Sequence, residues 1–154
     1  MELGSIDRNI LRVLQERGRI SYVDLSKSVG LSVTPCKERV RRLEQQGYIC
    51  GYSARLDPSK LNAGLAVFVQ VRLSRKSQDI FSEFRDAAMA LSEIQECFLV
   101  SGNFDYLIKA RVADMAAYRI LLGETLLKLP GVQESSSFVV MEVIKESLRV
   151  EIPY

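Results

Sequence analysis

Lys37, Arg39, Arg41 and Arg42 place four cationic side chains within one short stretch of the sequence. The apolar residues between them recur at helical spacing, so the cations would occupy the outer face of a helix. Arginine matches the O6 and N7 acceptors of guanine as a bidentate donor, and both residue types bind phosphate. Lys37 and Arg41 lie one turn apart and can reach base edges or phosphates. Arg39 and Arg42 suit backbone phosphates or salt bridges to Glu38, Glu44 or Glu16.

Three short helices are predicted to position this basic face. Ser5 is a candidate N-cap of the first helix, and Ser21 with Asp24 forms a capping pattern at the start of the second. Gly30 ends the second helix and permits a tight reversal. This order of helix, glycine-containing turn and helix is typical of a helix-turn-helix, whose second helix enters the DNA major groove.

The third helix has two candidate starting points. Thr34 can act as its N-cap with Pro35 in the first helical position, or Ser32 can cap it one turn earlier. Residues 48–56 read as a strand that follows this helix. A basic amphipathic helix is also compatible with plain solvation, but the capped helices, the glycine turn and the basic face together favour DNA binding.

The composition excludes several classes of protein. The chain has 154 residues, of which 47% are hydrophobic, and it contains no histidine. Histidine-dependent catalysis and the common zinc sites are therefore absent, and with no phosphate-binding loop or metal cluster we do not expect an enzyme or a metal cofactor. Cys36, Cys50 and Cys97 read as reduced, half-buried residues of a cytoplasmic protein. We see no membrane span or secretory signal.

The charge is unevenly distributed. Residues 1–60 contain 11 basic and 7 acidic side chains, whereas residues 61–154 contain 10 and 12. This asymmetry suggests a module that faces a polyanion, joined to a second module. We accordingly divide the chain into a helix-turn-helix domain at 1–56, a linker at 57–64 and a second domain at 65–154.

The second domain reads as strand, helix, two strands, helix and strand. Strands are expected at 65–73, 94–101, 106–112 and 132–144, with helices opening near Ser77 or Asp79 and at Asp114. This βαββαβ order predicts a ferredoxin-like sandwich with both helices on one face of an antiparallel sheet. The other face carries Phe68, Phe98, Val100 and Val140, so we expect it to pair with a second copy.

The chain resembles the Lrp/AsnC family of transcriptional regulators over essentially its whole length, and most closely its leucine-responsive members. In the first domain the motifs that carry the resemblance are Ile6–Leu11, Gly18–Ser21, Val29–Ser32, Thr34–Cys36, Glu38–Glu44 and Gly47–Ile49. In the second domain they are Ile94–Cys97, Val100–Tyr106, Tyr118–Arg119, Leu122–Leu126 and Leu129–Val132.

The resemblance implies an α+β protein, with a winged helix-turn-helix domain followed by a ferredoxin-like RAM domain. It implies a cytoplasmic, nucleoid-associated bacterial regulator that binds double-stranded DNA and assembles from homodimers to octamers. The DNA-contacting set is then Ser21, Ser32, Thr34, Pro35, Lys37, Glu38, Arg39, Arg41 and Arg42. An architectural protein that wraps DNA without an effector is the alternative.

The family also implies an amino-acid effector, leucine or another apolar amino acid, bound between the RAM domains of neighbouring dimers. Its determinants would be Leu99, Ser101, Gly102, Asn103, Asp105, Met115, Phe138, Val139 and Val140. Backbone N–H groups near Gly102 could bind the carboxylate of the amino acid, and Asp105 its ammonium group. The residues alone also allow Gly102 and Asp105 simply to form the turn. Asn103 and Phe138 depart from the acidic residue and the tyrosine common in the family, which bears on effector specificity.

Overall fold

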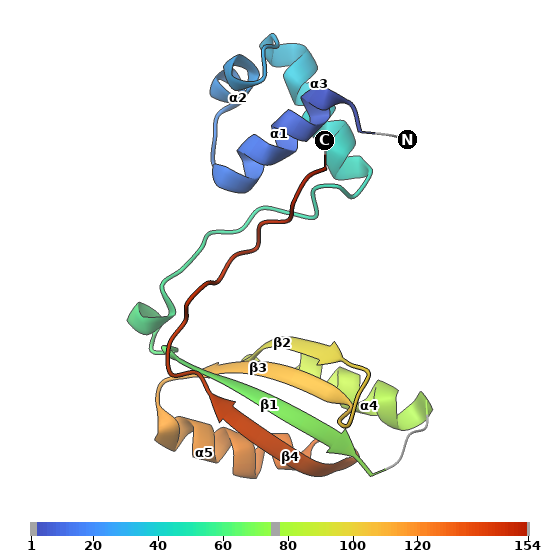
Figure 1. The fold of residues 1–154 in the computed structure, drawn as a ribbon, viewed down its shortest axis with the longest axis vertical. Helices are drawn as coiled ribbons and strands as arrows, with labels where there is room; N and C mark the ends of the chain where they lie inside the picture. Colours follow the sequence, from blue (N-terminus) through green and yellow to red (C-terminus); the bar gives the residue numbers. More distant parts are fainter. Residues whose placement is uncertain (1–2, 75–77, 154) are drawn as a thin grey trace. The chain divides into compact units, whose positions relative to one another are not determined.

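The computed structural model describes residues 3–74 and 78–153, which form two compact units. Unit 1 comprises Met1–Arg55 together with Lys145–Tyr154, and unit 2 comprises Leu56–Ile144 (Figure 1). The expected linker at 57–64 belongs to unit 2 and contains a short 3-10 helix, Pro58–Leu61. The expected second domain at 65–154 differs from this division at its end, because the last ten residues group with the first unit.

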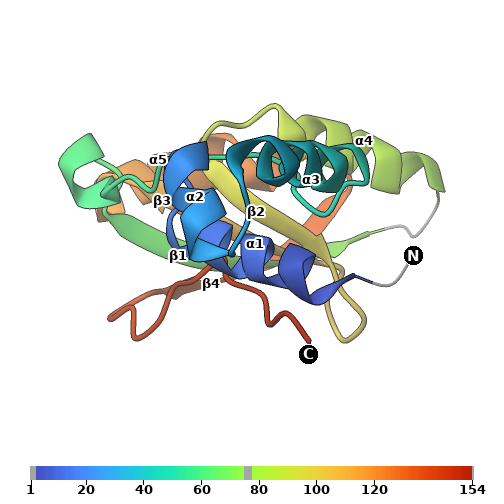
Figure 2. The same ribbon diagram turned by 90° about the horizontal axis from the view of Figure 1, so that it is seen from above.

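Unit 1 is built from three helices that follow one another through short turns (Figure 2). They are α1 (Ser5–Glu16), α2 (Tyr22–Ser28) and α3 (Val33–Gln45). One apolar side from each helix faces the centre of the unit, which fixes their packing by removing that surface from water. The fully buried side chains of this core are Ile10, Leu25, Cys36, Val40 and Leu43.

The helix starts confirm the Ser21 cap, correct the Ser5 cap and decide between the two candidate caps of α3. The Ser21 Oγ accepts a hydrogen bond from the Asp24 amide at 3.1 Å, as the capping pattern predicts. The N-cap of α1 is Gly4 rather than Ser5. The N-cap of α3 is Ser32 rather than Thr34, and its carbonyl accepts its first helical bond from the Cys36 amide. Pro35 therefore lies where no helical N–H is needed, which is why it is tolerated in the first turn.

The reversal between α2 and α3 depends on Gly30. Its φ is +70°, a left-handed conformation that side-chain-bearing residues adopt only with strain. The Leu31 amide then reaches back to the Ser26 carbonyl at 2.9 Å, which satisfies the end of α2. The turn is short because a backbone amide of the turn itself satisfies a free carbonyl at the end of α2.

The predicted strand at 48–56 does not form. The segment is extended, but it has no strand pairing in the part of the chain that the structure describes, and a strand needs a neighbour for its backbone bonds. It is held to α3 instead by the Tyr52 hydroxyl, which donates to Glu44 Oε1 at 2.9 Å. Desolvation, followed by this bond and the Glu44 charge, raises the pKa of Tyr52 to about 12.

The end of the chain packs on α1. Gln15 forms two bonds with Val150: its Nε2 donates to the carbonyl at 3.1 Å, and its Oε1 accepts from the amide at 2.8 Å. Arg12 Nη2 donates to the Ile152 carbonyl at 3.1 Å, and Arg149 pairs with Glu16 at 3.2 Å. We call residues 145–154 the C-terminal tail. Its backbone groups at Val150 and Ile152 bond to helix side chains rather than to a neighbouring strand.

Unit 2 has the predicted βαββαβ order. Its elements are β1 (Leu65–Leu73), α4 (Gln78–Met89), β2 (Ile94–Leu99), β3 (Tyr106–Val112), α5 (Met115–Glu124) and β4 (Val132–Val139). The four strands lie in the order β2-β3-β1-β4, and every neighbouring pair is antiparallel. The Asp114 cap is confirmed by its bond from the Ala117 amide at 2.8 Å.

Two strands of unit 2 are shorter than predicted, and one helix start is only partly described. β4 ends at Val139 rather than at residue 144, because the chain then leaves β1, its only neighbour in the described sheet. β2 likewise ends at Leu99, where the turn to β3 begins. Of the two expected starts of α4, Ser77 lies outside the described residues. No helix in the described part of the chain is long and apolar enough to cross a membrane.

The sheet presents two different faces. Both helices cover one face (Figure 1), where alternate residues of β1 and β3, such as Val69 and Ile108, are fully buried. The opposite face, which we call the open face, carries the other alternate residues. Phe98 and Phe138 on this face are 48% and 52% exposed, as expected for a surface that another molecule covers.

Gln15 provides a direct test of the docked tail. Replacing it by alanine removes both hydrogen bonds to Val150, and each such bond contributes roughly 1 kcal/mol. We expect amide hydrogen exchange at Val150 to accelerate by about tenfold or more in Gln15→Ala. Gln45→Ala, in α3, is the matched control and should leave that amide unchanged. Equal exchange at Val150 in both variants would contradict the docking.

Candidate functional site

The outer face of α3 is available to a ligand. Lys37, Glu38 and Arg41 are exposed. The side chains of Lys37 and Arg41 form no hydrogen bond or ion pair with any other residue that the structure describes. The side chains are therefore free to reorient, and two cations without anionic partners create a positive surface. This face matches the predicted DNA-reading surface in both location and charge.

The other two arginines of α3 have an internal partner. Asp7, in the first turn of α1, is 6% exposed and accepts from both. Arg39 Nη1 donates to one carboxylate oxygen at 2.9 Å, and Arg42 Nη2 donates to the other at 2.8 Å. The partner is thus Asp7 rather than the glutamates considered from the sequence. The interaction connects α1 to α3 and turns two cations away from the outer face.

The predicted DNA-contacting residues near the start of α3 are exposed or half-buried. Ser32 and Thr34 are exposed, and Ser32 makes no side-chain cap bond, so its hydroxyl is available. Pro35 is half-buried. Ser21 is exposed at the start of α2, but its hydroxyl already bonds the Asp24 carboxylate at 2.7 Å. Three amides in the first turn of a helix lack intrahelical partners, which favours a nearby phosphate.

The turn between β2 and β3 carries the first group of predicted effector residues. It runs from the exposed Leu99 through Ser101, Gly102 and Asn103 to the buried Asp105. Gly102 has a φ of +153°, which glycine adopts readily, and a Cβ there would meet no atom within 4 Å. The space beside this backbone is open to solvent.

This turn is tied to the end of β1. Asp105 is 5% exposed, and its Oδ2 accepts from the Leu73 amide at 2.8 Å, at the point where the pairing of β1 with β4 shifts register. Arg72 Nη2 donates to the Asn103 carbonyl at 2.6 Å. Asp105 therefore has a structural role in holding the turn, whatever its role toward a ligand.

The second group of predicted effector residues lies at the other end of the sheet. Val139 pairs with Val67, near the start of β1, whereas Tyr106, just after the turn, pairs with Val71. Four residues of strand separate these rows by roughly 13 Å. Met115 starts α5 at the same end as Val139, directly after β3. Phe138 and Val140, which flank Val139, complete this second group.

The two groups cannot both contact one small ligand within a single chain. A single extended residue is only about 3.5 Å long. A free amino acid is therefore far too short to reach from one end of the sheet to the other. Leu99, Met115 and Phe138 are all exposed and carry apolar side chains. A site that uses both groups must take them from different copies of the chain.

The open face carries a buried charged pair within its apolar surface, in addition to the more exposed pair of Arg72 with Glu134. Lys109 is buried on β3, and its Nζ donates to Glu96 Oε1 on β2 at 3.1 Å. Phe68 on β1 lies opposite Lys109 in the strand register, and Phe138 on β4 lies opposite Phe68. A buried charge needs such a partner, so the pair lets this face be covered without leaving the ammonium unpaired.

The three cysteines are free thiols, but they differ in burial. Cys36 is fully buried in the core of unit 1, and burial raises the pKa of its thiol. Cys50 and Cys97 are exposed, so the expectation of half-buried residues is wrong for all three. No group of three or more potential metal ligands occurs among the residues that the structure describes.

Sequence reasoning missed the tail contacts and the role of Asp7. The tail alternates apolar and polar residues from Leu148 to Ile152, which could have indicated an extended segment that docks. Asp7 lies in the first turn of α1. Nothing in a single sequence shows that its carboxylate faces two arginines more than thirty positions away.

Comparison with known proteins gives the family context. Residues 66–150 match the family model described as Lrp/AsnC ligand binding domain, and residues 3–49 match the winged helix-turn-helix DNA-binding model. Leucine-responsive regulatory proteins of Klebsiella pneumoniae and of Escherichia coli (strain K12) are each 61% identical to this chain over 151 residues, which cover 98% of this chain and 92% of theirs. A transcriptional regulator from Neisseria meningitidis, solved as its L-Met complex, is similar with a TM-score of 0.93 and 37% identity, over 97% of both chains.

The link between α1 and α3 can be tested through Asp7. Asp7→Asn removes the charge and weakens both arginine contacts, so we expect unit 1 to lose roughly 1–3 kcal/mol of its free energy of unfolding. Urea unfolding, followed by helical circular dichroism, measures the loss. Asp86→Asn, an exposed carboxylate of α4, is the control and should change little. Equal stability of the two variants would show that Asp7 does not hold α3.

Proposed function

The chain belongs to the Lrp/AsnC family of transcriptional regulators, and on that premise we propose which residues read DNA and where an amino-acid effector binds. It has a helix-turn-helix DNA-binding domain and an amino-acid-binding domain in one chain. The proposal is that leucine or another apolar amino acid changes both DNA affinity and assembly. The observation that carries it is the division of the effector determinants between opposite ends of the sheet, because it couples ligand binding to association.

α3 is the recognition helix in this proposal. Lys37 and Arg41, free and one turn apart, contact base edges or phosphates in the major groove. Ser32 and Thr34 supply hydroxyls at the helix start. Pro35 follows them and precedes Cys36, whose amide makes the first helical hydrogen bond. Arg39 and Arg42 act mainly by holding α3 against Asp7. Glu38 lies within the exposed face, where its carboxylate discriminates between bases by accepting a hydrogen bond from cytosine N4.

The effector site is shared between copies of the chain. The turn at 99–105 of one copy supplies backbone N–H groups beside Gly102, together with the Ser101 hydroxyl, for the carboxylate of the amino acid. A neighbouring copy supplies apolar surface from its second group: Met115, Phe138, Val139 and Val140. Asn103 carries no charge where a carboxylate is common in the family, so the contact with the ammonium group depends more on Asp105 and on backbone carbonyls.

The assembly follows from the same surfaces. Two open faces pair to form a dimer, which covers Phe68 and Phe98 and leaves the Lys109–Glu96 pair satisfied. The effector sites then lie where dimers meet, which allows growth to tetramers and octamers. An amino acid that binds one assembly better than another shifts the population toward it. As a bacterial DNA-binding regulator, the protein would act in the cytoplasm on the nucleoid.

Arg41 and Arg42 form a matched pair that tests the recognition helix. Arg41→Ala should weaken binding to a target duplex by about tenfold and lower the slope of log K against log salt by about one. Arg42→Ala should instead destabilise unit 1 and change the slope less. Filter binding over a salt series measures both, with a random duplex as competitor. If Arg41→Ala and the parent chain gave equal salt slopes, Arg41 would not be part of the interface. If the parent chain bound the target and the random duplex with equal affinity, the architectural alternative would be favoured.

Met115 tests the effector site. We expect leucine or methionine, among the twenty amino acids, to raise the Tm by several degrees at saturation and to change the sedimentation coefficient. Met115→Glu places a charge in the apolar part of the site and should abolish both effects. Met141→Glu, at a side chain that is 100% exposed, is the control and should respond like the parent chain. A response that survives Met115→Glu would place the effector elsewhere.

A further inference from the structure

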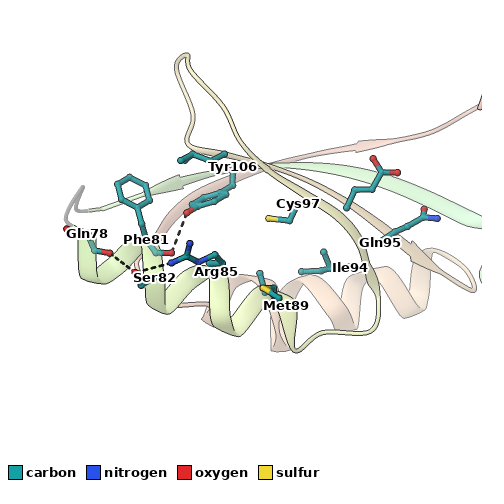
Figure 3. Close-up of a pocket in the computed structure, with 12 residues that line it drawn as sticks. Gln78, Phe81, Ser82, Arg85, Met89, Ile94, Gln95, Cys97 and Tyr106 are labelled. Carbon is teal, nitrogen blue, oxygen red and sulfur yellow. Dashed lines mark hydrogen bonds between the residues drawn. The ribbon is translucent and has the colours of Figure 1, made fainter. Parts of the chain in front are cut away.

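A cavity of about 920 Å³ lies between α4 and the edge strand β2 (Figure 3). Small-molecule sites typically enclose 300–1,000 Å³, so this one has room for more than a short side chain. It is lined from α4 by Phe81, Ser82, Arg85 and Met89. From the sheet, residues of β2 and the ring of Tyr106 complete it. Of the predicted effector residues, Leu99 alone is in this lining, at the end of β2.

One side of the cavity is polar and carries a single unpaired cation. Arg85 Nη2 donates to the Ser82 hydroxyl at 3.2 Å, which steers the guanidinium along the helix beside Gln78 (Figure 3). No acidic side chain among the described residues pairs with Arg85. Glu96 is the sole carboxylate in the lining, and it is already bound to Lys109 at 3.1 Å.

The remaining groups that could carry charge stay neutral. Burial raises the pKa of the Tyr106 phenol, and Arg85 only partly offsets this effect. Desolvation also raises the pKa of the Cys97 thiol. The tyrosine ring is fixed by stacking on Phe84, with 4.2 Å between ring centroids. At neutral pH the lining thus has one unpaired positive charge and no unpaired negative charge.

The other side of the cavity is apolar and open. Ala88, Met89 and Ile94 line it, whereas Leu99 lies at the opposite end of β2, where it pairs with Tyr106. The Met89 side chain is 80% exposed, which is unfavourable in water unless something covers it. An apolar chain laid along α4 toward Ile94 would bury it.

We propose that this cavity is a second small-molecule site, distinct from the amino-acid effector site, and that it binds a monocarboxylate with an extended apolar chain. The carboxylate accepts hydrogen bonds from Arg85, with Ser82 and Gln78 beside it, and the chain lies against Met89 and Ile94. An α-amino acid fits less well, because the one carboxylate of the lining is already paired and cannot neutralise an ammonium group.

Methionine methyl groups give a reporter for each site. The chain has four methionines, of which Met89 lies in this cavity and Met115 in the proposed effector site. With ¹³C-methyl methionine in the full-length protein, we expect octanoate to shift the Met89 signal saturably and to leave Met115 and Met141 unmoved. Leucine, in a separate titration, reports on Met115, so failure of one site is visible independently of the other.

Arg85 provides the variant and Arg119 the control. Arg85→Gln should weaken octanoate binding by about tenfold, because a charge-assisted hydrogen bond is lost. Arg119→Gln, which changes an exposed arginine on α5, should leave it unchanged. Octan-1-ol, which has the same chain but no charge, should bind more weakly than octanoate.

Three results would overturn the proposal. The first is the absence of any Met89 shift at millimolar octanoate. The second is equal binding of octanoate by Arg85→Gln and by the parent chain, or binding of octan-1-ol by the parent chain as tight as that of octanoate. The third is a Met89 signal that moves with protein dilution and not with octanoate, because the occupant would then be a second copy of the chain. Met89→Asp supplies a further check, since a carboxylate there should repel octanoate without disturbing the core.

Discussion

The arrangement of the DNA-binding unit depends on one buried carboxylate. Asp7 bonds Arg39 and Arg42 at once, and these two contacts join the first helix to the third. Without them the four cations of α3 would repel one another, and only the apolar core would hold the helix against α1. With them, two cations are paired within the unit, and two, Lys37 and Arg41, remain exposed on the outer face. Asp7 therefore decides which cations of α3 are paired within the fold and which are not.

A second constraint acts on unit 2. Antiparallel pairing places the β2–β3 turn and the end of β4 at opposite ends of the sheet. A ligand that needs both can bind only when two copies meet, so sensing and association become the same event. The sheet also carries an apolar open face with an internally neutralised charge, Lys109 with Glu96, which suits it to be covered. Linkage of this kind requires no long-range transmission within one chain.

Much of this could be predicted from the sequence, and the exceptions have physical reasons. The helices, the Ser21 and Asp114 caps and the βαββαβ order follow from local periodicity and capping chemistry, and the structure confirms them. The strand at 48–56 has the right residues but no partner, which local patterns cannot reveal. Asp7, the tail contacts and the cavity beside Arg85 depend on pairs of residues far apart in sequence, so only the folded chain shows them. The roles assigned to the DNA and effector residues stay predictions.

The docked tail has a consequence for how the protein is made. Unit 1 contains both the first 55 and the last ten residues of the chain. Domains generally fold in the order in which they leave the ribosome, N-terminal first. Here the three helices can form early, but Gln15 and Arg12 acquire their backbone partners only when residues 150–152 have been translated, after the whole of unit 2. The DNA-binding unit is thus begun before unit 2 and completed after it, so a nascent chain that has reached only unit 2 would display α1 without these contacts.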